Sequence, residues 1–558
     1  MSSSRTTSVL TVAAVTVLGG LFAYAVYFDY KRRNDSDFRK KLRKDKKKVT
    51  KQSEQAKAAN DAAAVVSAAE IKTALLKVRE EEVPPTPDEK EAYFMMQVQV
   101  GDQLLQKGPN FLLPAAMAFF RALRVYPSPV EFIMMLQQTL PETVFKVFME
   151  MVNADVASRV EGYYDYFPPK RMNVSVQHVG GQGNQATKKI LIAQKDFAAG
   201  DVIYMESPVV VALDADLEGN GTHCSYCFKR VEEGSAIAPE NDKLGSVFCS
   251  QECKDKAYYS WQNLYFALDP VLPPDLDMGM GAMTTDKRDA AQNVYLEWRK
   301  AKAKQANILG ARFIGKQVAL ETQKMSKEKA GPLAREIEQM ADGKDLYGIS
   351  DHIERLRFVE GHVTDEEVKL LREVLGSALP GLEQSVQENN HAVLVGKMAY
   401  NAIGVCPNGG RDDKPASTER PEDQERTRTP HGTSRQVGSG VYFVSSYIAH
   451  SCDPSARPVF ESNNELQLIA NRDIKKGDEI TIAWVDVTQH EGESTEEARR
   501  GRRVELARGW KFKCECERCV AEVVEDIEKE DAELGVQQDE SKVENVMRHE
   551  RVPDNGPD

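Results

Sequence analysis

Seven closely spaced cysteines offer the clearest chemistry in this 558-residue chain. Cys224 and Cys227 form a C-x-x-C pair, Cys249 and Cys253 form a C-x-x-x-C pair, and twenty-one residues separate the two pairs. Four thiolates at such spacings suit one tetrahedral structural zinc ion. The alternative is four unrelated buried cysteines, which seldom show paired spacings of this kind.

A second cysteine group lies near the C-terminus. Cys514, Cys516 and Cys519 supply three ligands, and Cys452 of Ala449-His-Ser-Cys452 is the obvious fourth. Clustered cysteines in a reducing compartment favour metal binding over disulfides. We therefore expect a second structural zinc ion.

The N-terminus carries an apolar run that predicts where these thiols lie. Val9–Phe28 contains twenty uncharged, mostly apolar residues, and Lys31–Lys51 contains twelve Lys/Arg against three Asp. A single-pass transmembrane helix needs about 20 such residues, and the positive-inside rule leaves the bulk of the chain in the cytosol. A secretory signal peptide with cleavage after Ala25 is the alternative, but the apolar run exceeds the usual ~7–15 residues and only Arg5 precedes it as a basic residue.

Charge is polarised along the chain, whose formal net charge is -13. Val520–Asp558 holds four basic and thirteen acidic residues, opposite in sign to the basic stretch beside the anchor. Basic residues next to a membrane helix meet anionic lipid headgroups, whereas a nucleic-acid role requires a basic folded domain. Nucleic acid is therefore not an expected partner.

Residues 91–175 predict a helical domain. Phe94–Leu105 and Ala115–Pro127 have the helix-turn-helix pattern of one tetratricopeptide-like repeat, which cannot bury its own apolar face. The following helices would cover it and leave an apolar groove, although core packing is the alternative for each side chain. The expected groove residues are Phe94, Met95, Val98, Phe132, Met135 and Leu136.

Ordered sequence motifs extend this interpretation. They are Phe28-Asp-Tyr-Lys-Arg-Arg-Asn-Asp35, Gln99-Val-Gly-Asp-Gln-Leu-Leu105, Leu136-Gln-Gln-Thr-Leu-Pro141 and Phe167-Pro-Pro-Lys-Arg-Met-Asn-Val-Ser-Val176. With the anchor, they resemble the fungal 20-kDa presequence receptor family of the mitochondrial outer-membrane translocase. The resemblance implies a receptor for amphipathic, Arg-rich mitochondrial presequences that contacts other translocase subunits, and adds Thr139 to the groove.

The cysteine-rich half resembles the SET and MYND family of protein-lysine methyltransferases. The resemblance implies that Cys452, Cys514, Cys516 and Cys519 share one zinc ion. The finger keeps only one of the family's two zinc sites.

The expected fold is a multidomain chain: a single-pass transmembrane helix, an all-α tetratricopeptide-like receptor domain, and an α+β SET domain with an inserted one-zinc MYND-like finger and a helical insertion. In order, the expected segments are a short tail (1–8), transmembrane helix (9–28), basic helical stalk and linker (29–90), receptor domain (91–175), first SET segment (180–214), finger (222–262), helical insertion (263–398), SET core (399–488) with a disordered stretch (407–436), post-SET segment (500–520) and acidic disordered tail (521–558).

The resemblance also exposes departures at the catalytic centre. Family members bind S-adenosylmethionine through glycines at the first SET segment and an asparagine where this chain has Ala449, while Gly181-Gln-Gly183 lies a few residues too early. Trp484 stands where the active-site tyrosine is expected. An indole cannot replace the phenol hydroxyl. Asn401 and His450 match the family's cofactor-binding positions, so S-adenosylmethionine binding is doubtful but has some support.

These observations predict an import receptor on the cytosolic face of the mitochondrial outer membrane, fused to a catalytically silent SET-like module whose own partner the sequence does not identify. The alternative is a membrane-tethered, S-adenosylmethionine-dependent protein-lysine methyltransferase. A further alternative is two neighbouring genes joined end to end, which a transcript spanning Asn173 to Lys195 would exclude.

Overall fold

The computed structural model describes residues 66–523, except 82, 85–86, 127–128, 180–187, 233, 241, 274–284, 326–332, 334–341, 343–346 and 422. The predicted transmembrane helix 9–28 and nearly all of the acidic tail lie outside the described residues. Within the described part, no helix combines the length and apolarity needed to cross a bilayer. The chain divides into two compact units, residues 1–162 and 163–558.

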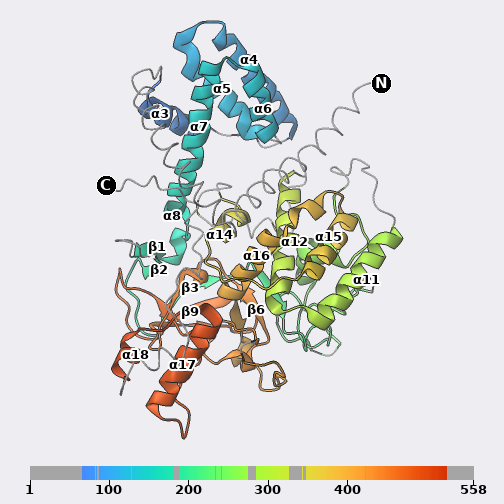
Figure 1. The fold of residues 1–558 in the computed structure, drawn as a ribbon, viewed down its shortest axis with the longest axis vertical. Helices are drawn as coiled ribbons and strands as arrows, with labels where there is room; N and C mark the ends of the chain where they lie inside the picture. The colour runs from blue at the N-terminus through green and yellow to red at the C-terminus, as the bar shows by residue number, and fades with distance from the viewer. Residues whose placement is uncertain are drawn as a thin grey trace, which may run out of the picture. The chain divides into compact units, whose positions relative to one another are not determined.

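The N-terminal unit is helical (Figure 1). Its elements are α3 (Ala68–Glu80), α4 (Pro87–Leu105), η1 (Pro109–Phe111), α5 (Leu112–Val125), α6 (Pro129–Thr139) and α7 (Glu142–Glu161). Helix α5 forms the centre, because it packs against both α4 and α7 and buries Phe119 and Phe120. The coarse prediction of an all-helical domain is therefore confirmed.

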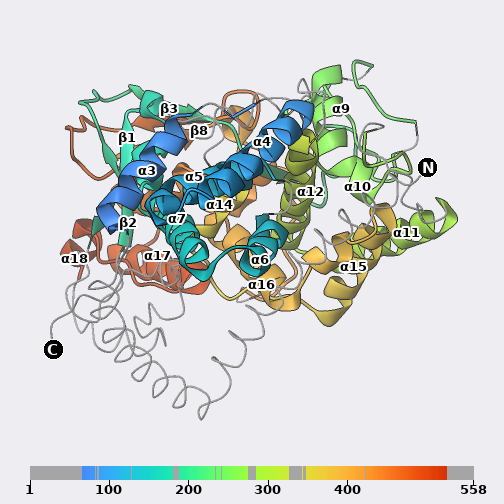
Figure 2. The same ribbon diagram turned by 90° about the horizontal axis from the view of Figure 1, so that it is seen from above.

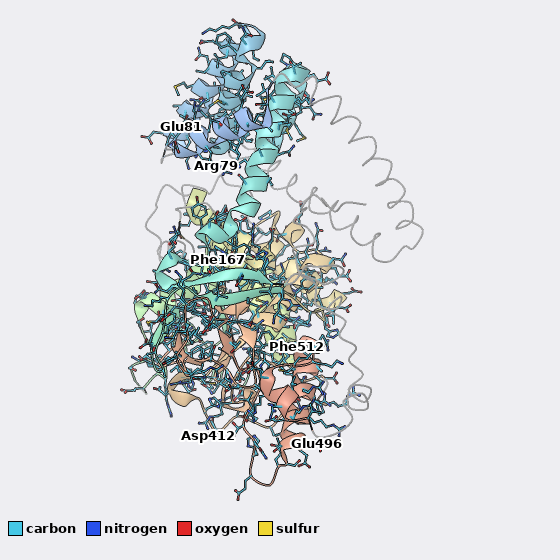
Figure 3. The ribbon with its side chains drawn as sticks, turned by 90° about the vertical axis from the view of Figure 1, so that its left-hand side faces the viewer. Arg79, Glu81, Phe167, Asp412, Glu496 and Phe512 are labelled. Atoms are coloured by element: carbon cyan, nitrogen blue, oxygen red, sulfur yellow. The ribbon has the colours of Figure 1, made fainter. Side chains whose placement is uncertain are left out.

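Helix α3 belongs to this core, whereas the sequence analysis placed its residues in the basic helical stalk and linker of residues 29–90. Ser67 caps the helix, and Ile71, Leu75 and Val78 on one face are buried against the unit. Arg79 of α3, labelled in Figure 3, forms an ion pair with Asp155 of α7 at 2.6 Å. The composition suggested a solvated helix, but the i, i+4, i+7 spacing of its apolar residues gives it a buried side.

The described part of the C-terminal unit contains four small sheets. Their strands are β1 (Val174–Val179), β2 (Lys188–Ala193), β3 (Val202–Glu206), β4 (Val210–Leu213), β5 (Ile403–Val405), β6 (Gly438–Val441), β7 (Ala449–His450), β8 (Ala456–Val459), β9 (Leu466–Ala470) and β10 (Thr481–Ile482). The sheet orders are β1-β2, β3-β9-β8, β4-β6-β5 and β10-β7. Strands β3 and β4 thus pair with β9 and β6, which lie more than two hundred residues later in the chain. The two ends of the unit's sequence therefore meet in its sheets.

Helices occupy much of the span between β4 and β5. Among the described residues of this unit they are α8 (Tyr163–Tyr166), α9 (Gln251–Ala257), α10 (Asn263–Tyr265), α11 (Thr285–Lys302), α12 (Gln305–Met325), α14 (Ile349–Glu354), α15 (Asp365–Ala378), α16 (Glu388–Asn401), α17 (Thr495–Trp510) and α18 (Glu517–Ala521). Short turns are η2 (Lys170–Met172), η3 (Tyr258–Gln262, a π-helix), η4 (Leu382–Ser385), η5 (Pro407–Gly409), η6 (Thr433–Arg435) and η7 (Ser445–Tyr447). Helices α11 and α15 lie side by side (Figures 1 and 2), and α12 packs against α16.

The C-terminal unit begins earlier than the sequence predicted. Tyr163 and Phe167 are buried in its core, and β1 pairs along its whole length with β2 (Phe167 is labelled in Figure 3). The expected receptor boundary at residue 175 therefore falls inside this unit. The segment was assigned to the receptor by its motif, but its aromatic side chains bury apolar surface in the other unit.

The predicted disorder of residues 407–436 is wrong. Apart from residue 422 the stretch is described, and Thr427, Arg428 and Thr429 within it are buried. Arg411 is anchored to Asp216 at 2.6 Å. A polar, Pro-containing composition suggested too little apolar surface for burial, but these polar side chains find hydrogen-bond partners in the core.

Candidate functional site

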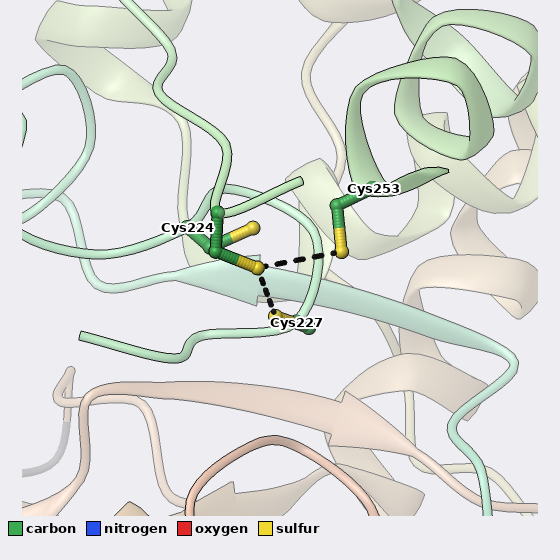
Figure 4. Close-up of side chains that lie close together, drawn as sticks. Cys224, Cys227 and Cys253 are labelled. Carbon is green, nitrogen blue, oxygen red and sulfur yellow. Dashed lines mark hydrogen bonds between the residues drawn. The ribbon is translucent and has the colours of Figure 1, made fainter. Parts of the chain in front are cut away.

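The first thiol cluster joins two segments of the finger. Cys224 and Cys227 follow β4, whereas Cys249 precedes α9 and Cys253 lies on its first turn, where Ser250 caps the helix. The four sulfurs lie within 4.8 Å of one another. The thiols of Cys224, Cys227 and Cys253 turn toward a common point (Figure 4).

The second cluster joins the SET core to the post-SET segment. Cys452 follows β7, Cys514 and Cys516 follow α17, and Cys519 lies on α18. The structure brings all four sulfurs within 4.8 Å of one another. Cys452 Sγ lies 3.8 Å from Cys514 Sγ and 3.4 Å from Cys519 Sγ.

Both clusters fit a tetrahedral metal ion. Zinc–sulfur bonds of about 2.3 Å place the sulfurs of a tetrahedral site ~3.8 Å apart, close to the 3.7 Å between Cys249 and Cys253. These separations are too long for a disulfide, whose sulfurs lie about 2.05 Å apart, and all nine cysteines are free. Neighbouring thiols donating hydrogen bonds lower the pKa of Cys224 and of Cys516, which favours the thiolate form that binds metal.

Arginines surround the second cluster. Arg518 donates from Nη1 to the carbonyl of Cys452 at 3.1 Å, and Arg499 donates from Nε to the carbonyl of Cys519 at 2.8 Å. Burial acts to lower the pKa of the Arg502 guanidinium, but the neighbouring Cys452 and Glu522 outweigh this effect and raise the pKa. These cations fix the ligand backbone and offset the charge of four thiolates.

Asn401 is fully engaged within the protein. Its amide nitrogen donates to the carbonyls of Arg357 and Lys397, both at 2.8 Å, and Oδ1 accepts from Arg428 at 3.1 Å. The side chain is 1% exposed. Both amide protons are therefore committed to helix α16 and its neighbour, and neither is free for a cofactor.

His450 connects the centre to the second thiol cluster. Its Nδ1 accepts from the backbone N–H of Trp484 at 3.1 Å, and its Nε2 lies 3.3 Å from Cys452 Sγ. Burial lowers the pKa of His450 to about 4, so the ring is neutral at pH 7. Accepting at Nδ1 places the proton on Nε2, which faces the cysteine.

Trp484 lies in an aromatic cluster that holds an internal cation. Its ring packs at 5.5 Å from Trp510 and 5.6 Å from Phe512 (labelled in Figure 3). The guanidinium of Arg428 lies 3.9 Å from the Trp484 ring centroid. Burial lowers the pKa of Arg428 to about 9, so it remains charged at neutral pH.

The described residues do not fit S-adenosylmethionine. The side chains of Asn401 and His450 form hydrogen bonds within the protein. Ala449 has no polar side chain, and the guanidinium of Arg428 lies over the Trp484 ring. Gly181-Gln-Gly183 lies outside the described residues. The sequence identified Trp484 but missed Arg428, because nothing in its polar, Pro-containing segment signals a buried side chain.

The expected groove residues divide by burial. Phe132 and Leu136 are buried, Phe94 and Val98 are partly buried, and Met95, Met135 and Thr139 are exposed. The Phe94 ring of α4 packs 5.1 Å from Phe132 of α6. The structure thus brings the two helices together through Phe94 and Phe132 and leaves the methionines at the surface.

Two family models match the chain. The model of the MAS20 protein import receptor matches residues 11–165, and the model of the SET domain matches residues 188–484. The mitochondrial import receptor subunit tom20 of Neurospora crassa is 36% identical over 168 residues, which cover 29% of this chain and 87% of that protein.

Further relatives match each half. The mitochondrial import receptor subunit TOM20 of Saccharomyces cerevisiae is 35% identical over 158 residues, covering 27% of this chain and 84% of the relative. The histone-lysine N-methyltransferase SET5 of Saccharomyces cerevisiae is 26% identical over 380 residues, 63% of each chain. The chain therefore belongs both to the MAS20 protein import receptor family and, through its C-terminal part, to the SET domain family.

Proposed function

We propose that this protein is an import receptor of the mitochondrial outer membrane that recognises amphipathic presequences and passes the precursors to the translocase. One observation carries the proposal: Met95 and Met96 on α4 and Met134 and Met135 on α6 are 44–62% exposed beside the Phe94 contact between the helices. The import receptors named above support the same function.

The chemistry of this surface suits a presequence helix. Methionine is unbranched and polarizable, so exposed methionines adapt to many different apolar helix faces. Helix α4 also carries Glu91 and Asp102 at the surface, opposite in charge to the arginines of a presequence. Such helix-in-groove recognition accepts degenerate sequences at modest affinity.

The expected anchor completes the proposal. Val9–Phe28, followed by its basic collar, would hold the receptor in the outer membrane with both units in the cytosol. Resistance of the chain to alkaline extraction from mitochondria, lost when residues 1–30 are deleted, would support this topology. Extraction of the intact chain would contradict it.

Anisotropy of a labelled presequence peptide, titrated with the full chain, tests the groove. Met135→Asp should weaken binding at least tenfold, because it places a carboxylate where an apolar helix face docks. Val156→Asp is the matched control, since Val156 is 56% exposed on α7 of the same unit. Equal affinities of wild type and Met135→Asp would refute the groove assignment.

We propose further that the SET module is catalytically silent, with its metal sites occupied by zinc. Trp484 and the fully engaged Asn401 support this reading, whereas the named activity of SET5 supports the alternative, a tethered protein-lysine methyltransferase. Calorimetry of the full chain with S-adenosylmethionine separates the two. We expect no heat of binding, and micromolar affinity would establish the alternative.

A further inference from the structure

Residues Thr427–Thr429 lie beside β5 and pair with it through one isolated parallel bridge, between Ile403 and Arg428. The backbone N–H of Arg428 donates to the carbonyl of Ala402 at 2.8 Å, and the N–H of Gly404 donates to the carbonyl of Arg428 at 3.1 Å. On the other side, the N–H of Thr429 donates to the carbonyl of Trp484 at 3.2 Å. The segment is therefore paired on one side with β5, in parallel, and on the other with Trp484.

The side chain of Arg428 fills a closed site beneath this segment. It is fully buried, and its nitrogens donate to the carbonyls of Tyr400 and Ser446, each at 3.0 Å, and to Asn401 Oδ1 at 3.1 Å. No carboxylate among the described residues forms an ion pair with it. The faces of Trp484 at 3.9 Å and Tyr400 at 5.2 Å supply the compensating negative potential.

The flanking chain has the character of a linear peptide. Residues 415–421 are exposed, residues 424–426 are half-buried, and Thr427–Thr429 are buried. Strand addition with one deeply seated side chain is a common mode of peptide recognition: backbone hydrogen bonds supply affinity and the pocket supplies specificity. Here the pocket matches a guanidinium, because three acceptors and two ring faces surround its planar donors.

We infer that Thr427–Thr429 is an internal ligand that occupies a binding site for the arginine side chain of an extended peptide and holds the Asn401–Trp484 centre closed. The inference deepens the proposed silence of the SET module and rests on it for its functional meaning. The site differs from the candidate cofactor site in its ligand, since it takes a cation on aromatic faces.

Chemical rescue tests the site. Arg428→Ala should lower the thermal unfolding midpoint of the full chain, and methylguanidinium should restore part of the loss in a saturable manner. Methylammonium at the same ionic strength should restore less, because it lacks the planar set of donors. Arg420→Ala is the matched control, since Arg420 lies in the same segment with its side chain 77% exposed. Equal responses of the two variants, or no response of Arg428→Ala, would overturn the inference.

Hydrogen exchange of the unmodified chain covers the case in which Arg428→Ala does not fold. The amides of Arg428, Thr429 and Gly404 should exchange about 100-fold or more slowly than those of residues 415–421. Exchange of residues 428–429 as fast as that of 415–421 would overturn the inference. These outcomes are separate from the calorimetric test: binding of S-adenosylmethionine refutes silence, whereas failed rescue removes only the internal ligand.

Discussion

A hydrogen bond joins the hydroxyl of Tyr163 to Nδ1 of His352, with 2.5 Å between the two atoms. Tyr163 lies within the part of the chain that matches the import receptor model, and His352 lies within the SET match. The guanidinium of Arg355 lies 4.0 Å from the Tyr163 ring centroid. Residues of the two family matches thus share one core, which favours a single folded protein over an accidental joining of two genes.

Replacing Tyr163 should destabilise the C-terminal unit. Tyr163→Ala removes a fully buried ring, which typically costs about 3–5 kcal/mol, whereas Tyr163→Phe should cost about 1–2 kcal/mol because His352 Nδ1 loses its hydrogen-bond partner. All four tryptophans, Trp261, Trp298, Trp484 and Trp510, follow residue 163, so tryptophan fluorescence during urea unfolding reports this unit.

Tyr166→Ala is the matched control for Tyr163→Ala, since Tyr166 lies on the same helix α8 and is 38% exposed. It should shift the urea midpoint much less. A Tyr163→Ala transition that coincides with that of the wild type would show that the segment is dispensable to the C-terminal unit.

The His352 contact also predicts a pH dependence of stability. Burial, with a smaller contribution from the Arg355 charge, lowers the pKa of His352 to about 3. At pH values between about 3 and the ordinary pKa of about 6.5, His352 is protonated in the unfolded chain but not in the folded chain. The free energy of unfolding therefore falls as the pH falls. At pH 5 this loss is about 2 kcal/mol.

A variant isolates this effect from other titrating groups. Burial raises the pKa of Glu206 to about 7, which gives stability the opposite slope over part of the same range. His352→Asn retains an acceptor for Tyr163 but does not titrate, so urea titrations should show the variant gaining about 2 kcal/mol relative to wild type from pH 7 to pH 5. A constant difference across this range would contradict the buried, neutral histidine.

Spacing and motif predicted the parts of the site that depend on local sequence. Both sets of thiols were identifiable because their paired spacings reflect the geometry of one metal ion, and the structure brings Cys452 to the three post-SET cysteines sixty-two or more residues away. Trp484 was identifiable because it replaces an expected tyrosine at a fixed distance from a recognisable motif.

Long-range packing was not predictable in the same way. The burial of Arg428 depends on acceptors supplied by Tyr400, Asn401 and Ser446, which no local pattern connects to residue 428. The boundary at residue 162 was missed for a similar reason, because a family motif continues past the point where the chain changes core. Composition indicates solvation only when no distant partner satisfies the polar groups.

Metal content should follow the two thiol clusters. Purified chain should contain one zinc ion for each cluster, and Cys227→Ser or Cys516→Ser should each lower the measured content by one ion, because a structural site needs all four ligands. Cys406→Ser is the matched control, since Cys406 belongs to neither cluster. Elemental analysis gives the stoichiometry; unchanged zinc in Cys516→Ser would contradict the second site.

Gly101 explains why the receptor motif Gln99–Leu105 carries a glycine. A Cβ at this position of α4 would lie 2.6 Å from Cζ of Phe119, a buried ring of α5. Gly101→Ala should therefore force the two helices apart and cost about 1–3 kcal/mol, despite the better helix propensity of alanine. Val100→Ala, at a neighbouring 37% exposed position, is the control and should be nearly neutral.

Urea unfolding of Gly101→Ala distinguishes the two units, because residues 1–162 contain no tryptophan. The loss of helix measured by circular dichroism should begin at a lower urea concentration than in the wild type, while the transition measured by tryptophan fluorescence should stay in place. Movement of both transitions together would mean that the two units unfold as one.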